Sequence, residues 1–204
     1  MPTMPREVAS LFRSWAWTLL FRKSPCLALT ITFWAVMGSA PHARAQAEGV
    51  GEYQVKAAFL YNFAKFVEWS PEAVPKADAP FILGVVGEDP FGPVLEETLK
   101  GKTANGHPFA IRRFRREEDA RGCQILFTSS SDQRYIRSLL AILKGSSVLT
   151  VGETEGFCRL GGIVNFTLEE DKVRFEINRD AAERARLKIS SKLLSVAKVV
   201  RDQQ

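Results

Sequence analysis

Four apolar-rich runs of strand length recur along the chain after residue 80, and amphipathic segments separate them. They cover residues 81–87, 107–114, 124–128 and 147–151. Nearly continuous apolar runs of this length are typical of strands that are covered on both faces, as in a parallel sheet.

Helices are predicted between these strands. We expect Asp89 to cap a helix that starts at Pro90 and runs to about Lys100. Asp132 is expected to cap a second helix, because the apolar residues after it recur at three- and four-residue spacing.

The last third of the chain carries a different pattern. Residues 162–168 and 172–178 flank an acidic turn and predict an antiparallel hairpin, and two short helices are expected near residues 179–184 and 190–200. Strands that alternate with helices favour a single-domain α/β fold with a mostly parallel sheet, helices on both faces and this C-terminal antiparallel hairpin at one edge.

Residues 51–69 predict a helix with two apolar stripes rather than one. The second stripe contains Phe59, Phe63, Phe66 and Trp69, and a polar seam with Glu52 and Lys56 separates it from the first. A helix that lies on one sheet needs a single stripe, so the second must be buried against another part of the fold or another chain. We expect these four aromatic residues to form a partner-binding surface.

The N-terminal segment is typical of a secretory signal peptide. Arg22 and Lys23 precede a short uncharged apolar run, and Ala45 or Ala47 marks the expected cleavage point. The run is shorter than the roughly 20 apolar residues of a membrane-spanning helix, although an uncleaved anchor stays an alternative. Residues 1–45 are therefore predicted to be a signal peptide and residues 46–204 one exported domain.

The net charge of +5 does not indicate a nucleic-acid partner. The first 45 residues hold five bases and one acid, which leaves the rest of the chain nearly neutral. A nearly neutral domain exerts little long-range attraction on nucleic acid.

Two cysteines, Cys123 and Cys158, remain after the signal peptide. In an oxidising compartment they are the candidate disulfide, although the sequence leaves open whether their sulfur atoms meet. No cysteine–histidine cluster accompanies them, so we expect no metal site.

Four polar residues near the C-terminus are the candidate ligand-binding group. Glu176 and Asn178 lie on the outward face of the last strand, and Lys188 and Ser190 precede the last helix, where they could hold an anion. Each also has a structural interpretation, since Asn178 and Ser190 suit helix caps. No catalytic set can be assembled around His107, so neither enzymatic activity nor a cofactor is predicted.

Several motifs together resemble the YfiR-like family of small periplasmic proteins. In order they are EYQVKAAFLYNF and KFVEW, GEDPFG, CQILF, LTVG, GGIVNF, FEIN and LKISSKLL. The resemblance implies a periplasmic regulator that tends to form homodimers and represses an inner-membrane diguanylate cyclase, which lowers cyclic-di-GMP.

The resemblance leaves other partners and the cysteines open. A sensor kinase is an alternative partner, and a periplasmic module that binds an anionic metabolite, and feeds a sensor kinase or an uptake system, is the alternative function. By alignment with the family, the positions that would pair with Cys123 and Cys158 hold Gly84 and Asn165 here, so family-type disulfides are not expected.

Overall fold

The computed structural model describes residues 40–76, 78–115 and 117–201. The chain divides at Gln46 into two units, and the description below concerns the second, Ala47–Gln204. Most of the predicted signal peptide, residues 1–39, lies outside the described residues, so the signal peptide stays a prediction.

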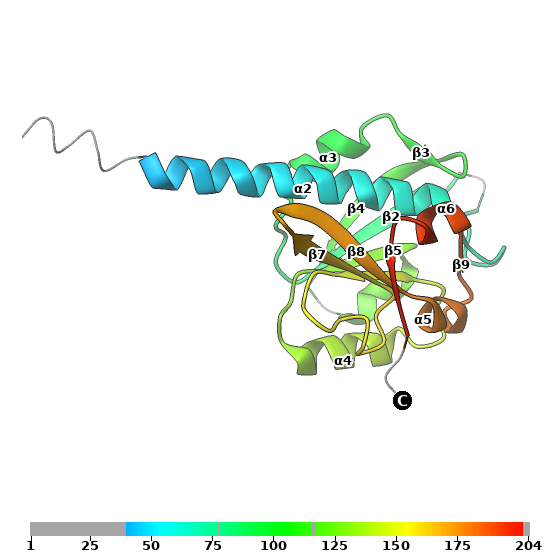
Figure 1. Cartoon of the computed structure of the whole chain (residues 1–204). Helices are drawn as coiled ribbons and strands as arrows, with labels where there is room; N and C mark the ends of the chain where they lie inside the picture. Colours follow the sequence, from blue (N-terminus) through cyan, green and yellow to red (C-terminus); the bar gives the residue numbers. More distant parts are fainter. Residues whose placement is uncertain (1–39, 77, 116, 202–204) are drawn as a thin grey trace, which may run out of the picture. The chain divides into compact units, whose positions relative to one another are not determined.

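An eight-stranded sheet forms the centre of this unit (Figure 1). Five neighbouring strands run parallel, β8 runs antiparallel to β7, and short strands complete both edges. In spatial order the strands are β10 (Lys198–Val200), β8 (Lys172–Asn178), β7 (Val164–Glu169), β6 (Leu149–Gly152), β5 (Ile125–Thr128), β2 (Phe81–Val86), β4 (His107–Phe114) and β3 (Thr103–Ala104). The predicted α/β fold with a mostly parallel sheet and a C-terminal hairpin is confirmed.

Alternating side chains of the central strands supply two apolar clusters. On β5, Ile125 and Phe127 belong to the cluster that contains helix α2 (Ala40–Phe66). Leu126 belongs to a second cluster, which contains Leu139 of helix α4 (Gln133–Ile142). Because successive side chains of a strand point to opposite faces, helices cover both faces of the sheet, as predicted.

The second stripe of α2 is buried largely within its own fold. The ring of Phe63 lies 5.2 Å from that of Phe175, and Phe59 lies 5.1 Å from the same ring, measured between centroids. Hairpin β7–β8 supplies Phe175 and also Phe166, which contacts both helix residues. Of the two alternatives that the sequence left open, another part of the fold provides most of the cover.

Helix α2 ends three residues before the predicted end. Val67 and Glu68 form strand β1, which pairs antiparallel with β9 (Lys188–Ile189). This pairing draws the backbone into an extended conformation, so Trp69 lies beyond the helix.

The prediction that Asp89 caps a helix is wrong. Its Oδ1 accepts a hydrogen bond from the backbone N–H of Phe91, and its Oδ2 accepts one from Arg113 at 2.6 Å. Gly92 follows with a φ of +51°, which a right-handed helix cannot contain. Helix α3 (Val94–Leu99) therefore starts after this turn.

The predicted final helix is also too long. Helix α6 covers only Ser191–Leu194, and strand β10 follows and pairs parallel with β8. The β-branched residues Val199 and Val200 complete the sheet edge beside β8, which local periodicity could not indicate. The preceding helix α5 (Arg179–Arg184) and the 3-10 helix η1 (Glu117–Gly122) complete the described elements.

No helix among the described residues is both long enough and apolar enough to cross a membrane.

Candidate functional site

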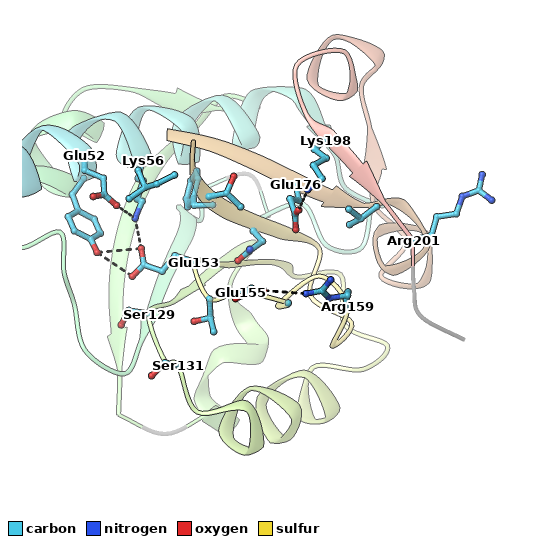
Figure 2. Close-up of a pocket in the computed structure, with 18 residues that line it drawn as sticks. Glu52, Lys56, Ser129, Ser131, Glu153, Glu155, Arg159, Glu176, Lys198 and Arg201 are labelled. Carbon is cyan, nitrogen blue, oxygen red and sulfur yellow. Dashed lines mark hydrogen bonds and ion pairs between the residues drawn. The ribbon is translucent and has the colours of Figure 1, made fainter. Parts of the chain in front are cut away.

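A hollow of about 1030 Å³ lies at the carboxyl ends of strands β5 and β6 (Figure 2). Ser129 follows β5 and Glu153 follows β6, and both line it. Helix α2 contributes Lys56, and β8 contributes Glu176. In open α/β sheets the carboxyl ends of parallel strands are the usual place for ligands, so this hollow is the candidate site.

A buried ammonium group lies at one end of the hollow. Lys56 is only 4% exposed, and its Nζ lies 2.6 Å from Oε2 of Glu153 and contacts the carboxylate of Glu52 one helical turn earlier. Figure 2 shows these three side chains converging from α2 and from the loop after β6. A charge buried this deeply needs such partners, because an unpaired ammonium would lose its hydration without compensation.

Tyr53 completes this charged cluster. Its hydroxyl donates to the carboxylate of Glu153 at 3.3 Å, and the ammonium of Lys56 lies 4.5 Å from the centre of its ring. Burial, followed by the negative charges of Glu153 and Glu52, raises the pKa of Tyr53 above its ordinary value. The phenol therefore stays protonated and acts as a donor at neutral pH.

The other end of the hollow lies over β7 and β8. Asn165 is 1% exposed, and its Oδ1 has no hydrogen-bond partner among the described residues. On the neighbouring strand, Glu176 pairs with Lys198 at 2.9 Å, and this hydrogen bond raises the pKa of the exposed Lys198. Asn165 and Glu176 are register partners, so their side chains share one face of the sheet.

In this arrangement the charged side chains mostly pair with one another, so few of them are left as reactive groups. The charge of Lys56 is already matched by two carboxylates, and Glu176 is matched by Lys198. Within residues 40–76, 78–115 and 117–201, no group of three or more His, Cys, Asp and Glu side chains is placed to hold a metal ion.

Of the four predicted ligand-binding residues, only Glu176 lines the hollow. The Oδ1 of Asn178 accepts from the backbone N–H of Ala181, and its Nδ2 donates to the carbonyl of Cys158. Ser190 accepts from the N–H of Leu193. Asn178 and Ser190 are therefore helix caps, the structural alternative that the sequence had left open.

Lys188 lies away from the hollow, on β9. Its ammonium is exposed and lies 3.3 Å from a carboxylate oxygen of Glu68 on the paired strand β1. Whether Lys188 and Glu176 bind a ligand stays a prediction.

The four residues predicted to bind a partner differ in accessibility. Phe63 and Trp69 are buried in the core, whereas Phe59 and Phe66 keep part of their surface exposed. A partner could reach only the second pair without unpacking the core, and such contact stays a prediction.

The candidate disulfide between Cys123 and Cys158 is not formed, and both thiols are free and buried. Cys123 donates to the carbonyl of Ala120, and Cys158 donates to that of Ile163. A Cβ added at Gly84 would lie 3.2 Å from Sγ of Cys123. Gly84, the position that the alignment paired with Cys123, therefore lies beside Cys123 in this fold.

Sequence reasoning missed Lys56 and Glu153 as site residues. Lys56 lies in the polar seam between two apolar stripes of the helix. That position could have indicated a buried charge, because a seam flanked by apolar surface becomes buried once both stripes are covered. Glu153 follows a buried strand, and nothing local indicated that it would meet a residue 97 positions earlier.

Comparison with known proteins identifies one family. The sequence profile described as YfiR/HmsC-like matches residues 53–198. No curated protein matches. A crystal structure of a conserved domain protein from Vibrio cholerae is similar at a TM-score of 0.42 and 15% identity, over 58% of this chain and 54% of that one. The chain thus aligns with about half the length of that solved protein.

Proposed function

Because the chain belongs to the YfiR/HmsC-like family, we propose that it binds the periplasmic part of an inner-membrane diguanylate cyclase and holds it inactive. Family membership supports the broader role of a periplasmic regulatory protein. The single observation that carries the proposal is the extent of the match, which runs from Tyr53 in α2 through the sheet to Lys198 at the start of β10.

The charged cluster is consistent with a binding protein rather than an enzyme. Lys56, Glu153 and Tyr53 contact one another and hold α2 against the loop after β6. A sensor kinase is the alternative partner, and the homodimer stays part of the proposal. The alternative function, binding of an anionic metabolite at Lys188, has less support because Asn178 and Ser190 are used as caps.

We place the partner contact on the exposed apolar surface of α2 and the adjacent hairpin. Val55 is 44% exposed one turn before Phe59, and Leu168 is 57% exposed two residues after Phe166. Phe59 and Phe166 are in ring contact, at 6.2 Å between centroids. Apolar side chains that gather at one place on a surface are typical of protein contacts.

The test uses the native host and measures cellular cyclic-di-GMP. Deletion of the gene is expected to raise cyclic-di-GMP, and the intact gene restores the low level. Val55→Asp and Leu168→Asp are expected to fail to restore it, because a charge on the contact surface must lose its hydration on binding.

Val196→Asp is the matched control, because it introduces the same charge at another exposed valine. Val196 is 64% exposed and lies on the segment between α6 and β10. It is expected to restore repression. Unchanged cyclic-di-GMP after deletion would refute the proposed role, whereas full repression by the Val55 and Leu168 variants would refute only the surface.

A further inference from the structure

A second, smaller pocket of about 290 Å³ lies at the opposite edge of the sheet, at the amino ends of β5 and β6. Four segments far apart in the sequence meet there. They contribute Ser70 after β1, Arg121 at the end of η1, Ser146 and Ser147 before β6, and Arg186 after α5. This volume lies at the small end of the range for ligand pockets.

Two arginines of this pocket have no acidic partner. Nε of Arg121 donates to the carbonyl of Ile142 at 3.1 Å, and Nη2 of Arg186 donates to that of Gly145 at 3.0 Å. Within the described part of the chain neither guanidinium forms an ion pair. Each group is thus held in place by one backbone carbonyl, and its other N–H groups stay free for a ligand.

Three hydroxyl groups of the pocket also lack partners. Oγ of Ser70 is buried and makes no hydrogen bond to a described residue. The hydroxyls of Ser146 and Ser147 likewise bond to no described group. A buried hydroxyl without a partner costs free energy, and an oxyanion in the pocket would remove that cost at Ser70 once the side chain rotates its Oγ, which has almost no exposed surface, toward the pocket.

We propose that this pocket binds a small oxyanion of the phosphate type. Guanidinium groups match the geometry of such oxyanions and can donate two hydrogen bonds in parallel, and serine hydroxyls can donate to the remaining oxygens. The site is separate from the proposed partner surface and does not depend on the identity of the partner.

One acidic residue, Glu72, also lines the pocket. Its side chain is exposed and pairs with neither arginine among the described contacts. A carboxylate at the mouth repels an oxyanion, so Glu72→Gln is expected to strengthen phosphate binding.

The experiment titrates the exported domain with inorganic phosphate by calorimetry, at constant ionic strength maintained with chloride. Saturable binding at one site is expected. Arg121→Gln and Arg186→Gln are each expected to raise the Kd about tenfold or more, since each removes charge-assisted hydrogen bonds. Arg174→Gln is the matched control, because Arg174 is exposed on β8, outside the pocket, and is expected to leave the Kd unchanged.

Ser70→Ala separates binding from folding. It is expected to weaken phosphate binding while it leaves the free energy of unfolding of the ligand-free protein unchanged or higher, because the hydroxyl has no protein partner to lose. Absence of saturable binding overturns the proposal. So does an unchanged Kd, equal to that of Arg174→Gln, in Ser70→Ala or in the two arginine variants.

A parallel titration with glycerol 3-phosphate distinguishes the source of the anion. Binding of phosphate alone identifies the free ion as the ligand. Equal or tighter binding of the ester identifies the phosphate group of a small phosphomonoester.

Discussion

Lys56 Nζ lies 2.6 Å from Oε2 of Glu153, and this contact joins helix α2 to the loop after β6 across 97 residues of chain. Glu52 contacts the same ammonium from the preceding turn of α2. The position of α2 on the face of the sheet therefore depends on one buried charge as well as on apolar packing.

Lys56→Ala is expected to lower the free energy of unfolding by about 1–3 kcal/mol. The variant leaves the carboxylates of Glu52 and Glu153, which are 25% and 15% exposed, near each other without their cation, and their partial access to water lowers the cost below that of a fully buried pair. Urea unfolding measures the change. Lys192→Ala, at an exposed position of α6, is the control and is expected to change the free energy by no more than about 0.5 kcal/mol. Equal losses in the two variants would contradict a structural role for the cluster.

Gly152→Ala and Gly162→Ala are both expected to destabilise the domain by about 1–3 kcal/mol or more. The ring of Phe157 lies between these two glycines, and an added Cβ would come within 2.6 Å of it at Gly152 and 2.1 Å at Gly162. A ring buried between these two backbone segments cannot move away without disturbing the end of β6 or the turn before β7. Thermal and urea unfolding measure the loss.

Gly51→Ala is the matched control for these glycine variants. No atom lies within 4 Å of the added Cβ at Gly51 in helix α2, so a gain of about 0.5–1 kcal/mol is expected from helix propensity. A neutral result at Gly162 would mean that Phe157 is not held as described.

Asn178→Ala is expected to cost about 1–3 kcal/mol in unfolding free energy. It removes the cap of α5, worth about 0.5–2 kcal/mol, and the hydrogen bond from Nδ2 to the carbonyl of Cys158, worth about 0.5–1.5 kcal/mol because that carbonyl also accepts from the N–H of Gly161. Asn178→Asp retains the acceptor for the cap but loses the donor, so the two variants separate the contributions. If neither changes stability, the two hydrogen bonds of Asn178 do not hold α5 in place as described.

The two thiols predict a pH dependence of stability. Burial raises the pKa of Cys123 and that of Cys158 to about 12, from an ordinary value of 9.0. Unfolding then releases protons above about pH 9, so each thiol's contribution is fully present below that pH and is lost as the pH rises toward about 12. Stability measured between pH 8 and 11, roughly the onset of this window, is expected to fall with rising pH.

The double variant Cys123→Ser, Cys158→Ser is expected to show a shallower fall above about pH 9, since serine does not titrate there. In the native protein both thiols are expected to react slowly with a thiol reagent at neutral pH, and to react at once after unfolding. Rapid labelling of the folded protein would contradict the burial of the thiols.

Local signals made much of the fold predictable. The apolar runs identified β2, β5 and β6 because strands covered on both faces need little other than apolar residues, whereas β4 has no buried residue and was found from its shorter apolar stretch. The sequence indicated Asp132 as a cap, and Asn178 as a cap or a ligand-binding residue, because a cap bonds to an N–H only two or three residues later. The prediction for Asp89 failed because an aspartate also suits a tight turn. The positive φ of Gly92 is compatible with the turn and not with a helix.

The sequence by itself determined the α/β class, the order of most elements and the presence of two apolar stripes on α2, because side-chain periodicity is a property of neighbouring residues. Only the tertiary structure decided what covers the second stripe, that Lys56 meets Glu153, that two cysteines stay apart and that Arg121 and Arg186 line one pocket. These outcomes depend on which distant segments the sheet brings together, and the residues next to each position in the sequence do not indicate which distant segment it will contact.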